Sequence, residues 1–323
     1  MLPLRHFRKD EATRDRHAET TWSSEQLIQA LFVTTESKGK EPVPGFPGVC
    51  RHGLESLLHE VEALLTAGIR KVLLFGVVPP SYKDEAASWA LRADGPVPTA
   101  VRELKRRFPE LEVFTDVCVC GYTSHGHCGL VRGEEVSNDE SVLLLARMAV
   151  VHGEAGADWV APSAMMDGQV EAIRRALDGR GLSGVRILSY AAKYASRLYG
   201  PFRDAAGSAP AFGNRRSYQM DVRNGAEALV EVWADLAEGA DAVMVKPALF
   251  YLDVIQRVRA AFPRVRLAAY LVSGEYAMLV RAEEEGSAPG AFREAVTAIF
   301  RAGADLLITY DTRRIASWGG DHA

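Results

Sequence analysis

The sequence lacks any apolar run approaching the roughly 18 residues that a membrane-spanning helix needs, and it lacks a strong excess of either charge. Its 38 lysines and arginines against 42 aspartates and glutamates leave a net charge of −4, and the basic residues are scattered. Residues 1–17 are charged rather than apolar, unlike a secretory signal. We therefore expect a cytoplasmic protein whose partner is a small molecule, with no nucleic acid and no membrane as partner.

Cysteine is also scarce, and the reducing cytosol disfavours a disulfide framework. Three of the four cysteines, Cys118, Cys120 and Cys128, lie in the run TDVCVCGYTSHGHCG at 115–129. Three thiolates at this C-x-C-x7-C spacing can surround one soft metal ion, zinc above all, and leave a fourth position for water or substrate. The other interpretation is that they are small buried hydrophobes. Their clustering beside Asp116 favours a catalytic zinc site.

No G-x-G-x-x-G motif follows the first apolar strand at 27–33, so a dinucleotide-binding sheet is not indicated. Four segments share the order of a helix end, a glycine and an apolar run: 65–76, 153–163, 236–247 and 300–311. Each glycine suits the left-handed position that ends a helix, and apolar runs without alternation are typical of parallel strands buried on both faces. Three more such runs bring the count to eight: 111–119, 185–192 and 265–274.

Helical patterns lie between these strands, for example at 53–68, 99–108, 140–156, 168–179 and 225–239. Eight strands alternating with helices match a (β/α)8 TIM barrel, an α/β fold. We expect one catalytic barrel domain at 23–323. A polar N-terminal extension arm at 1–22 precedes it and is expected to be disordered or to pack on a neighbouring subunit. A homo-oligomer follows as a hypothesis.

Polar residues close the predicted strands, and in a (β/α)8 barrel the active site lies at these carboxyl ends. Two of these residues, Lys193 and Lys246, follow adjacent strands and would point into one cavity. Burial lowers the pKa of lysine, and a neutral amine attacks ketones to form Schiff bases. Exposed strand ends or structural ion pairs are the alternative. The other strand ends carry Asp116, Ser163, Ser273 and Tyr310.

The long stretch 194–221, which glycine and proline interrupt, is predicted to form an ordered lid over the site. It contains Arg203, Arg215 and Arg216, whose guanidinium groups can bind a substrate carboxylate, and Gln219, which adds an amide donor. The alternative is that one or more of these arginines pair with aspartates of the same stretch. A lid also keeps water from imine intermediates that hydrolyse easily.

With these residues identified, the chain resembles the porphobilinogen synthase family, also called 5-aminolevulinate dehydratase, over nearly its whole length. The resemblance implies a hydro-lyase that joins two molecules of 5-aminolevulinate, with loss of two waters, into the pyrrole porphobilinogen of heme and other tetrapyrrole synthesis. The motifs that carry it are PGVCR, LFGVVPP, DVCVCGYTSHGHCG, APSAMMDG, SYAAKYAS, YGPFRDAA, MVKP and VSGEYAM.

The resemblance also implies a role for each site residue. Lys246 would form a Schiff base with the first substrate, whose carboxylate Ser273 and Tyr310 hold. Lys193 would hold the second substrate by its ketone. That substrate's carboxylate is assigned to Arg203, Arg215 and Gln219, and Ser163 and Tyr199 line the same site.

The cysteines are those of the zinc-type members, in which zinc as a Lewis acid holds the second substrate's amine or a hydroxide. Asp116 would orient the groups bound to that zinc ion. Glu231 matches one contact of an allosteric magnesium at a subunit interface. The family is typically a homo-octamer assembled through N-terminal arms, which would give residues 1–22 a purpose.

Five positions depart from the family pattern, and those beside Lys193 leave the second-substrate pocket less polar. Two other functions therefore stay open. One is a paralogue that condenses 5-aminolevulinate to another product, such as a symmetric dihydropyrazine in specialised metabolism; the other is an inactive zinc-binding regulatory barrel. The departures are Ala164 for an aspartate, Gln169 for an arginine, Ala191 for a hydroxyl residue, Asn214 for an aspartate and Phe250 for a proline.

Overall fold

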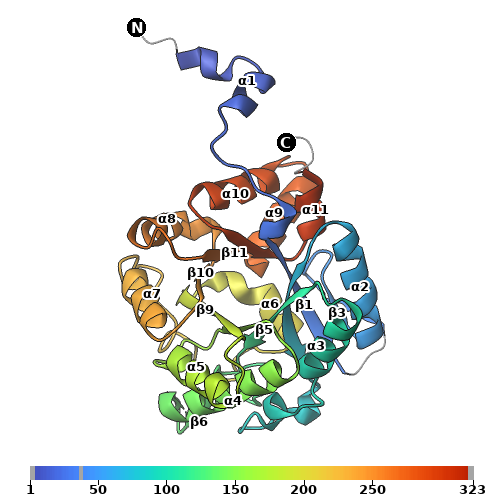
Figure 1. The fold of residues 1–323 in the computed structure, drawn as a ribbon, viewed down its shortest axis with the longest axis vertical. Coiled ribbons are helices and arrows are strands. Elements are labelled where there is room, and N and C mark those ends of the chain that lie inside the picture. The colour runs from blue at the N-terminus through green and yellow to red at the C-terminus, as the bar shows by residue number, and fades with distance from the viewer. Residues whose placement is uncertain (1–3, 36–38, 319–323) are drawn as a thin grey trace.

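The apolar runs of the sequence form eight parallel strands that close into a barrel (Figure 1). The computed structural model describes residues 4–35 and 39–318. Closure comes from the pairing of the first barrel strand with the last, Leu27 opposite Leu307. The predicted (β/α)8 barrel is confirmed. In order round the barrel the strands are β1 (Leu27–Thr34), β4 (Lys71–Val77), β5 (Glu112–Val117), β8 (Trp159–Pro162), β9 (Arg186–Lys193), β10 (Ala242–Lys246), β11 (Leu267–Tyr270) and β12 (Leu306–Thr309).

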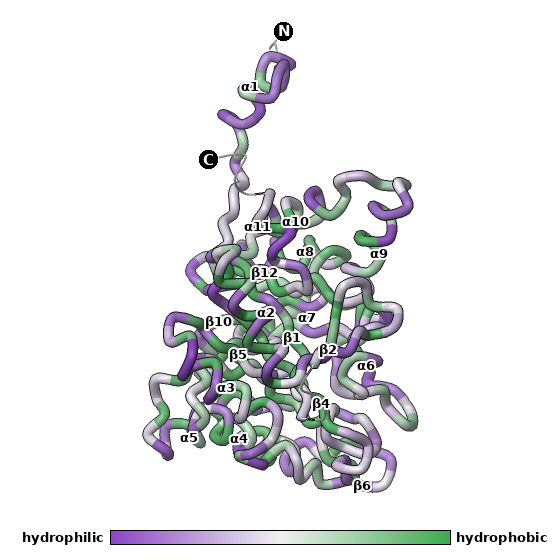
Figure 2. Tube along the Cα trace, turned by 90° about the vertical axis from the view of Figure 1, so that its right-hand side faces the viewer, coloured by the Kyte–Doolittle hydropathy of each residue, from purple (hydrophilic) through white to green (hydrophobic). Residues whose placement is uncertain are grey.

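Burial on both faces explains why these strands read as unbroken apolar runs. Every residue of β1, β8, β10, β11 and β12 is buried, because the interior is filled with side chains and helices cover the outside. Figure 2 shows the apolar chain gathered in the body of the barrel and polar stretches at its edge. No helix in the described part of the chain has the length and apolar character to cross a membrane.

The surrounding helices follow the strands, some after long connections, and several of them bury one apolar stripe. In α10 this stripe is Phe292, Val296 and Ile299, at the spacing of one helix face. The predicted helical patterns all lie on observed helices. The helices are α2 (Leu54–Thr66), α3 (Pro96–Arg107), α4 (Asn138–Glu154), α5 (Gln169–Gly179), α7 (Glu227–Ala237), α8 (Leu252–Ala261), α9 (Ser273–Glu284), α10 (Ala291–Arg301) and α11 (Thr312–Trp318).

Several elements are additions to the barrel that the sequence patterns did not indicate. An antiparallel hairpin of β2 (Lys40–Pro42) and β3 (Cys50–His52) lies beside β1, with Arg51 opposite Phe32. A second hairpin, β6 (Leu130–Arg132) and β7 (Glu135–Ser137), follows the cysteine cluster. The lid contains a short helix. It is α6 (Gly200–Ala206), preceded by the 3-10 turn η5 (Arg197–Tyr199); other 3-10 turns are η2 (Ser24–Gln26), η3 (Pro80–Tyr82), η4 (Ser88–Leu91) and η6 (Leu249–Tyr251).

The segment before β1 projects away from the barrel (Figures 1 and 2). It contains the 3-10 turn η1 (Leu4–Arg8) and helix α1 (Glu11–Arg16), and Leu4 and Phe7 expose their apolar side chains. Of the arm expected at 1–22, residues 1–3 lie outside the described residues. A short helix that contacts the barrel so little gains few of the tertiary contacts on which short helices depend.

Four glycines end helices before barrel strands, as the sequence predicted, and all four have positive φ: Gly68, Gly156, Gly239 and Gly303. At Gly156, where φ is 101°, an added Cβ would lie 3.7 Å from its nearest neighbour, the Cγ of Lys105. There is room for a methyl group at this position. The backbone conformation is therefore what demands glycine there.

We expect Gly156→Ala to lower the free energy of unfolding by about 1–2 kcal/mol, because an L-residue is strained in this conformation. Urea denaturation followed by tryptophan fluorescence measures the change. Gly179→Ala is the control, since Gly179 lies in a helix with open space around it and no positive φ. A Gly156 variant as stable as that control would contradict the assignment.

Candidate active site

The two candidate lysines are neighbours at the carboxyl ends of β9 and β10. Lys246 lies opposite Lys193 in the register, and each is only 5% exposed. The alternative of exposed strand ends is therefore wrong. The register shifts just before this pair, which leaves one extra residue in β9 between the partners of Val243 and Val245. Such a bulge breaks the two-residue alternation, so that the Tyr190 ring lies near the amines of both Lys193 and Lys246.

Aromatic rings surround the amine of Lys246. Its Nζ lies 4.1 Å from the ring centre of Tyr270, 4.8 Å from that of Tyr190 and 5.1 Å from that of Phe202. Burial, followed by the positive charge of Lys193, holds the pKa of Lys246 well below its ordinary value of 10.5. The amine is therefore available as a neutral nucleophile for a carbonyl carbon.

Asp116 and Ser163 lie beside these lysines. Lys193 Nζ donates a hydrogen bond to the Ser163 carbonyl oxygen. Asp116 is on β5, and its buried Oδ1 has no hydrogen-bond partner. Burial raises the pKa of Asp116 to about 6, and the charge of Lys193 works in the opposite direction. This leaves a carboxylate oxygen free to accept a hydrogen bond from a ligand next to both amines.

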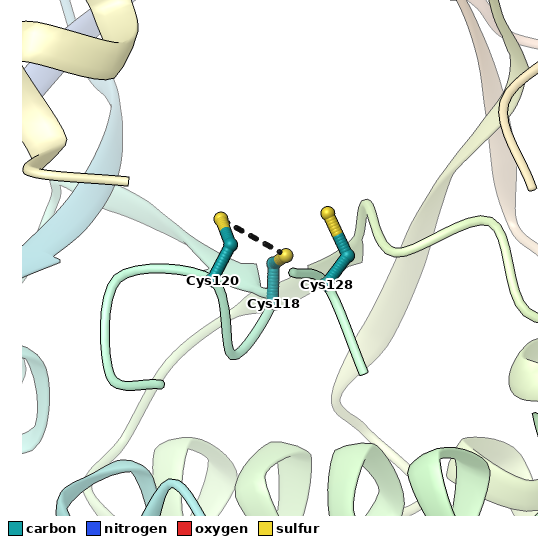
Figure 3. Close-up of side chains that lie close together, drawn as sticks. All are labelled: Cys118, Cys120 and Cys128. Atoms are coloured by element: carbon teal, nitrogen blue, oxygen red, sulfur yellow. Dashed lines mark hydrogen bonds between the residues drawn. The ribbon is translucent and has the colours of Figure 1, made fainter. Parts of the chain in front are cut away.

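The three clustered cysteines form a compact sulfur site directly after β5 (Figure 3). Their Sγ atoms all lie within 4.8 Å of one another, and those of Cys118 and Cys120 are 3.4 Å apart. All three are free thiols and buried. Hydrogen bonds from Cys118 and Cys120 hold the pKa of Cys128 well below its ordinary value. Three convergent sulfurs are a donor set that suits a soft metal such as zinc.

The predicted carboxylate-binding residues carry buried polar atoms without partners. These are the Nε atoms of Arg203 and Arg215 and both amide atoms of Gln219. Arg215 also donates to the carbonyl oxygens of Gly126, at 2.9 Å, and Ser208, at 2.6 Å. Leaving such groups unpaired is costly, and a carboxylate would satisfy guanidinium and amide donors together.

The aspartates of the lid do not compete for these arginines. Asp221 pairs with Arg223, at 2.6 Å between a guanidinium nitrogen and a carboxylate oxygen. Arg216 is exposed and lines an outer groove with Gln219. Of the three lid arginines predicted to bind a carboxylate, the structure therefore buries Arg215, half-buries Arg203 and leaves Arg216 exposed.

Ser273 and Tyr310 are buried just past the ends of β11 and β12, and Ser273 is the first residue of α9. Ser273 Oγ accepts from the Phe202 amide at 3.1 Å and donates to the Leu198 carbonyl oxygen at 3.2 Å, which ties the lid to α9. Gly274 permits this approach, because a Cβ there would lie 2.7 Å from the same oxygen. The Tyr310 hydroxyl accepts from Tyr270 at 3.0 Å.

Sequence reasoning missed most of the aromatic enclosure. Tyr190, Tyr270 and Phe202 were not singled out, since aromatic residues in strands and helices usually pack in cores. The hydroxyl of the predicted Tyr199 donates to the Tyr194 carbonyl oxygen at 2.8 Å, and its ring centre is 5.5 Å from Lys246 Nζ. The one local signal for Tyr190 is its place in the run SYAAK, directly after Ser189 and three residues before Lys193.

Glu231 lies away from the lysines, on α7. It lines an outer groove of about 900 Å³ that also contains Asp167, Glu227 and Glu238. Burial and then the charges of Asp167 and Glu227 raise the pKa of Glu231. In the described part of the chain, the cysteines are the one group of three or more potential metal-ligand atoms that lie this close together.

The five departures divide into inner and outer positions. Ala164 and Ala191 are 0% and 1% exposed, and Ala164 follows the serine whose carbonyl binds Lys193. Gln169 is buried too. Asn214 accepts a hydrogen bond from the Arg216 backbone amide at the surface, and Phe250 is 63% exposed. Only the first three lie deep enough to alter an interior pocket.

Comparison with known proteins identifies relatives along the whole chain. A family model described as delta-aminolevulinic acid dehydratase matches residues 2–318. The chain is 48% identical to the delta-aminolevulinic acid dehydratase of Archaeoglobus fulgidus, over 97% of this chain and 99% of that protein. It is 46% identical to the Bos taurus protein of the same name, over 93% of each.

A solved structure has the same fold. It is the delta-aminolevulinic acid dehydratase (porphobilinogen synthase) of Toxoplasma gondii ME49 in complex with the reaction product porphobilinogen. The two chains are 40% identical and superpose with a TM-score of 0.96, over 98% of this chain and 91% of the other. The chain therefore belongs to the delta-aminolevulinic acid dehydratase family.

Proposed function

We propose that this protein condenses two molecules of 5-aminolevulinate to porphobilinogen, as a hydro-lyase of heme and tetrapyrrole synthesis. The observation that carries the proposal is the pair of buried lysines facing each other across β9 and β10. The family membership and the porphobilinogen complex of the Toxoplasma gondii relative support it. A reaction that activates two ketones needs two amines, and an aldolase on this fold would need one.

Lys246 is assigned to the first substrate. Its neutral amine attacks the ketone carbon, a carbon–nitrogen bond forms, and the ketone oxygen leaves as water. The aromatic rings round the amine keep bulk water from hydrolysing the imine. Ser273 and Tyr310 are the residues proposed to bind this substrate's carboxylate.

Lys193 is assigned to the ketone of the second substrate. Arg203, Arg215 and Gln219 bind its carboxylate, which gives their unpaired donors a partner. The free Oδ1 of Asp116 accepts a proton from the substrate amine or carbon beside the lysines. Overall, one carbon–carbon and one carbon–nitrogen bond form between the substrates, two ketone oxygens leave as water, and both lysines are regenerated. Tyr199 and Ser163 line this site.

Cys118, Cys120 and Cys128 are the residues proposed to hold zinc. When bound there, zinc supplies a Lewis acid beside the second substrate. The negative charge of the thiolates also acts on the surroundings, since the cysteines stabilise the charged form of Lys246 and Arg215. The three thiols stay reduced in the cytoplasm, where we place the protein.

The assembly and the second metal extend the proposal beyond the active site. The arm at 1–22, distinct from the catalytic domain at 23–323, would join subunits into a homo-octamer; the exposed Leu4 and Phe7 suit a contact with another subunit. Glu231 is the proposed contact for an allosteric magnesium. The acidic side chains that share its groove suit a hard cation.

The product identifies the reaction. Zinc-loaded protein incubated with 5-aminolevulinate should give a pyrrole by carbon NMR and a positive Ehrlich test. The symmetric dihydropyrazine is an isomer of porphobilinogen, so connectivity rather than mass separates the two. A dihydropyrazine, or its oxidised pyrazine, would mean that the pocket near Ala164 and Ala191 has redirected the lysine chemistry.

Lys246→Ala should lower kcat by about 10³-fold or more, because it removes the nucleophile of the first imine. Borohydride reduction in the presence of 5-aminolevulinate should attach substrate to the wild-type lysine, as peptide mass spectrometry can locate, and leave the variant unmodified at this position. Lys71→Ala, which removes a lysine at the opposite end of a barrel strand, serves as control. Wild-type protein that traps no adduct at either Lys193 or Lys246 would revive the inactive-barrel hypothesis.

Cys120→Ala should lose zinc and most activity yet keep the fold, because two sulfurs bind the ion far less well than three. Metal content by mass spectrometry, circular dichroism and activity are measured together. Cys50→Ala removes the one cysteine outside the cluster and should leave all three readouts unchanged. Full activity of the wild-type protein after chelation to zero zinc would exclude the zinc role.

A further inference from the structure

The lid helix α6 depends on outside contacts for its position. It has seven residues, well short of the about 12–15 at which isolated helices become even marginally stable in water. Yet it carries two groups of the site: Phe202, whose ring centre lies 5.1 Å from Lys246 Nζ, and Arg203. A shift of α6 would therefore move the wall beside one lysine and a carboxylate-binding arginine together.

The start of α6 is fixed from inside the barrel. The Phe202 amide donates to Ser273 Oγ, and the Phe202 ring packs on Phe75 and Phe32, at 4.9 and 5.4 Å between ring centres. These contacts hold the first turn. At the other end, the backbone amides of Gly207 and Ser208 reach the carbonyl oxygens of Arg203 and Asp204. The remaining bonding capacity of the carbonyl oxygens there has to be satisfied by side chains from elsewhere.

Two cations from separate elements bind those last carbonyl oxygens. Arg51 on β3 donates from Nε to Ala205 and from a terminal nitrogen to Asp204, both at 2.7 Å. Lys83, in the connection after β4, donates to the Gly207 carbonyl oxygen just past the helix end. A guanidinium fork across two successive carbonyls fixes orientation as well as position, and positive charge is favourable at a helix C-terminus.

Other roles explain these two cations less well. Arg51 also lies 3.2 Å from a carboxylate oxygen of Glu41, but that side chain is 61% exposed, and exposed ion pairs contribute little. Burial lowers the pKa of Lys83, although the charge of Cys120 works against this. Keeping a lysine half-buried is costly unless it forms bonds there.

We infer that Arg51 and Lys83 are positioning residues, which hold the lid helix α6 closed over the barrel so that Arg203 meets the second substrate's carboxylate. This inference rests on the proposed function. It also gives the hairpin of β2 and β3 a purpose, since its register against β1 sets Arg51 opposite Phe32, the residue on which Phe202 packs. Both cations act through the helix and touch no reacting atom.

Arg51→Gln and Lys83→Met should each raise KM for 5-aminolevulinate by about tenfold while kcat changes by less than about threefold, as expected when a charge-assisted bond holding the closed state is lost. In the absence of substrate, the backbone amides of residues 197–207 should exchange hydrogen about tenfold faster in both variants than in the wild type. Exchange in the barrel strands should change little. Arg51→Lys, which can reach one carbonyl, should recover part of both effects.

Glu41→Gln and Lys71→Met are the matched controls. The first removes the ion pair of Arg51 and keeps its carbonyl bonds, and the second removes a lysine that also donates to a backbone carbonyl, at 2.7 Å, at the far end of β4. Both should behave as wild type. If Glu41→Gln reproduces the Arg51 effect, the ion pair and not the helix contact is responsible.

Three results would overturn the inference. One is wild-type KM and lid exchange in both variants. Another is faster exchange throughout the barrel, which would make the contacts merely structural. The third is lost zinc with unchanged lid exchange in Lys83→Met, which would mean that Lys83 acts on the cysteines. Failure of the proposed function can be told apart from failure of this inference. In that case the wild-type protein would form no porphobilinogen, whereas hydrogen exchange without substrate would still show whether Arg51 and Lys83 hold α6 in place.

Discussion

Two amines buried side by side in an apolar barrel are the constraint on which the rest of the site depends. Two ammonium ions in that setting would repel each other and lose their hydration. This repulsion is reduced because the pKa of Lys246 is well below its usual value, so that its amine carries less charge. Asp116, Cys120 and Cys118 act in the opposite direction, since negative charge on them stabilises the charged form of Lys246. The same lowering of the pKa therefore reduces the cost of burying Lys246 and leaves its amine neutral for attack on a ketone.

Much of this arrangement can be predicted from sequence because barrel geometry is so regular. Once eight buried runs are counted, residues that close them must meet at one end, so Lys193, Lys246 and the cysteines are found without a structure. The bulge in β9 cannot be found in this way, because an extra residue leaves no mark in an unbroken apolar run. That bulge is what brings Tyr190 to the same side as Lys193.

The lid shows a second limit of sequence reasoning. Arg203, Arg215 and Arg216 were all candidates to bind a carboxylate, and because they are the same residue type, their chemistry alone does not indicate that Arg216 is the exposed one. Arg51 gave no chemical signal at all, because its contacts are backbone carbonyls 153 and 154 positions away in the chain. Contacts to the main chain are independent of the partner's side chain, and sequence patterns do not record them.

The fastening of the lid has a kinetic consequence. The stretch 198–215 is attached to four different parts of the barrel. Ser273, Arg51 and Lys83 bond to it from outside, and its own Arg215 donates to the Gly126 carbonyl oxygen. An enclosure that keeps water away from an imine also retains a finished pyrrole until several of these bonds break together. Under the proposed function, we therefore expect lid opening to add to the time for which the product stays bound, so that the tightest lid would not give the fastest enzyme.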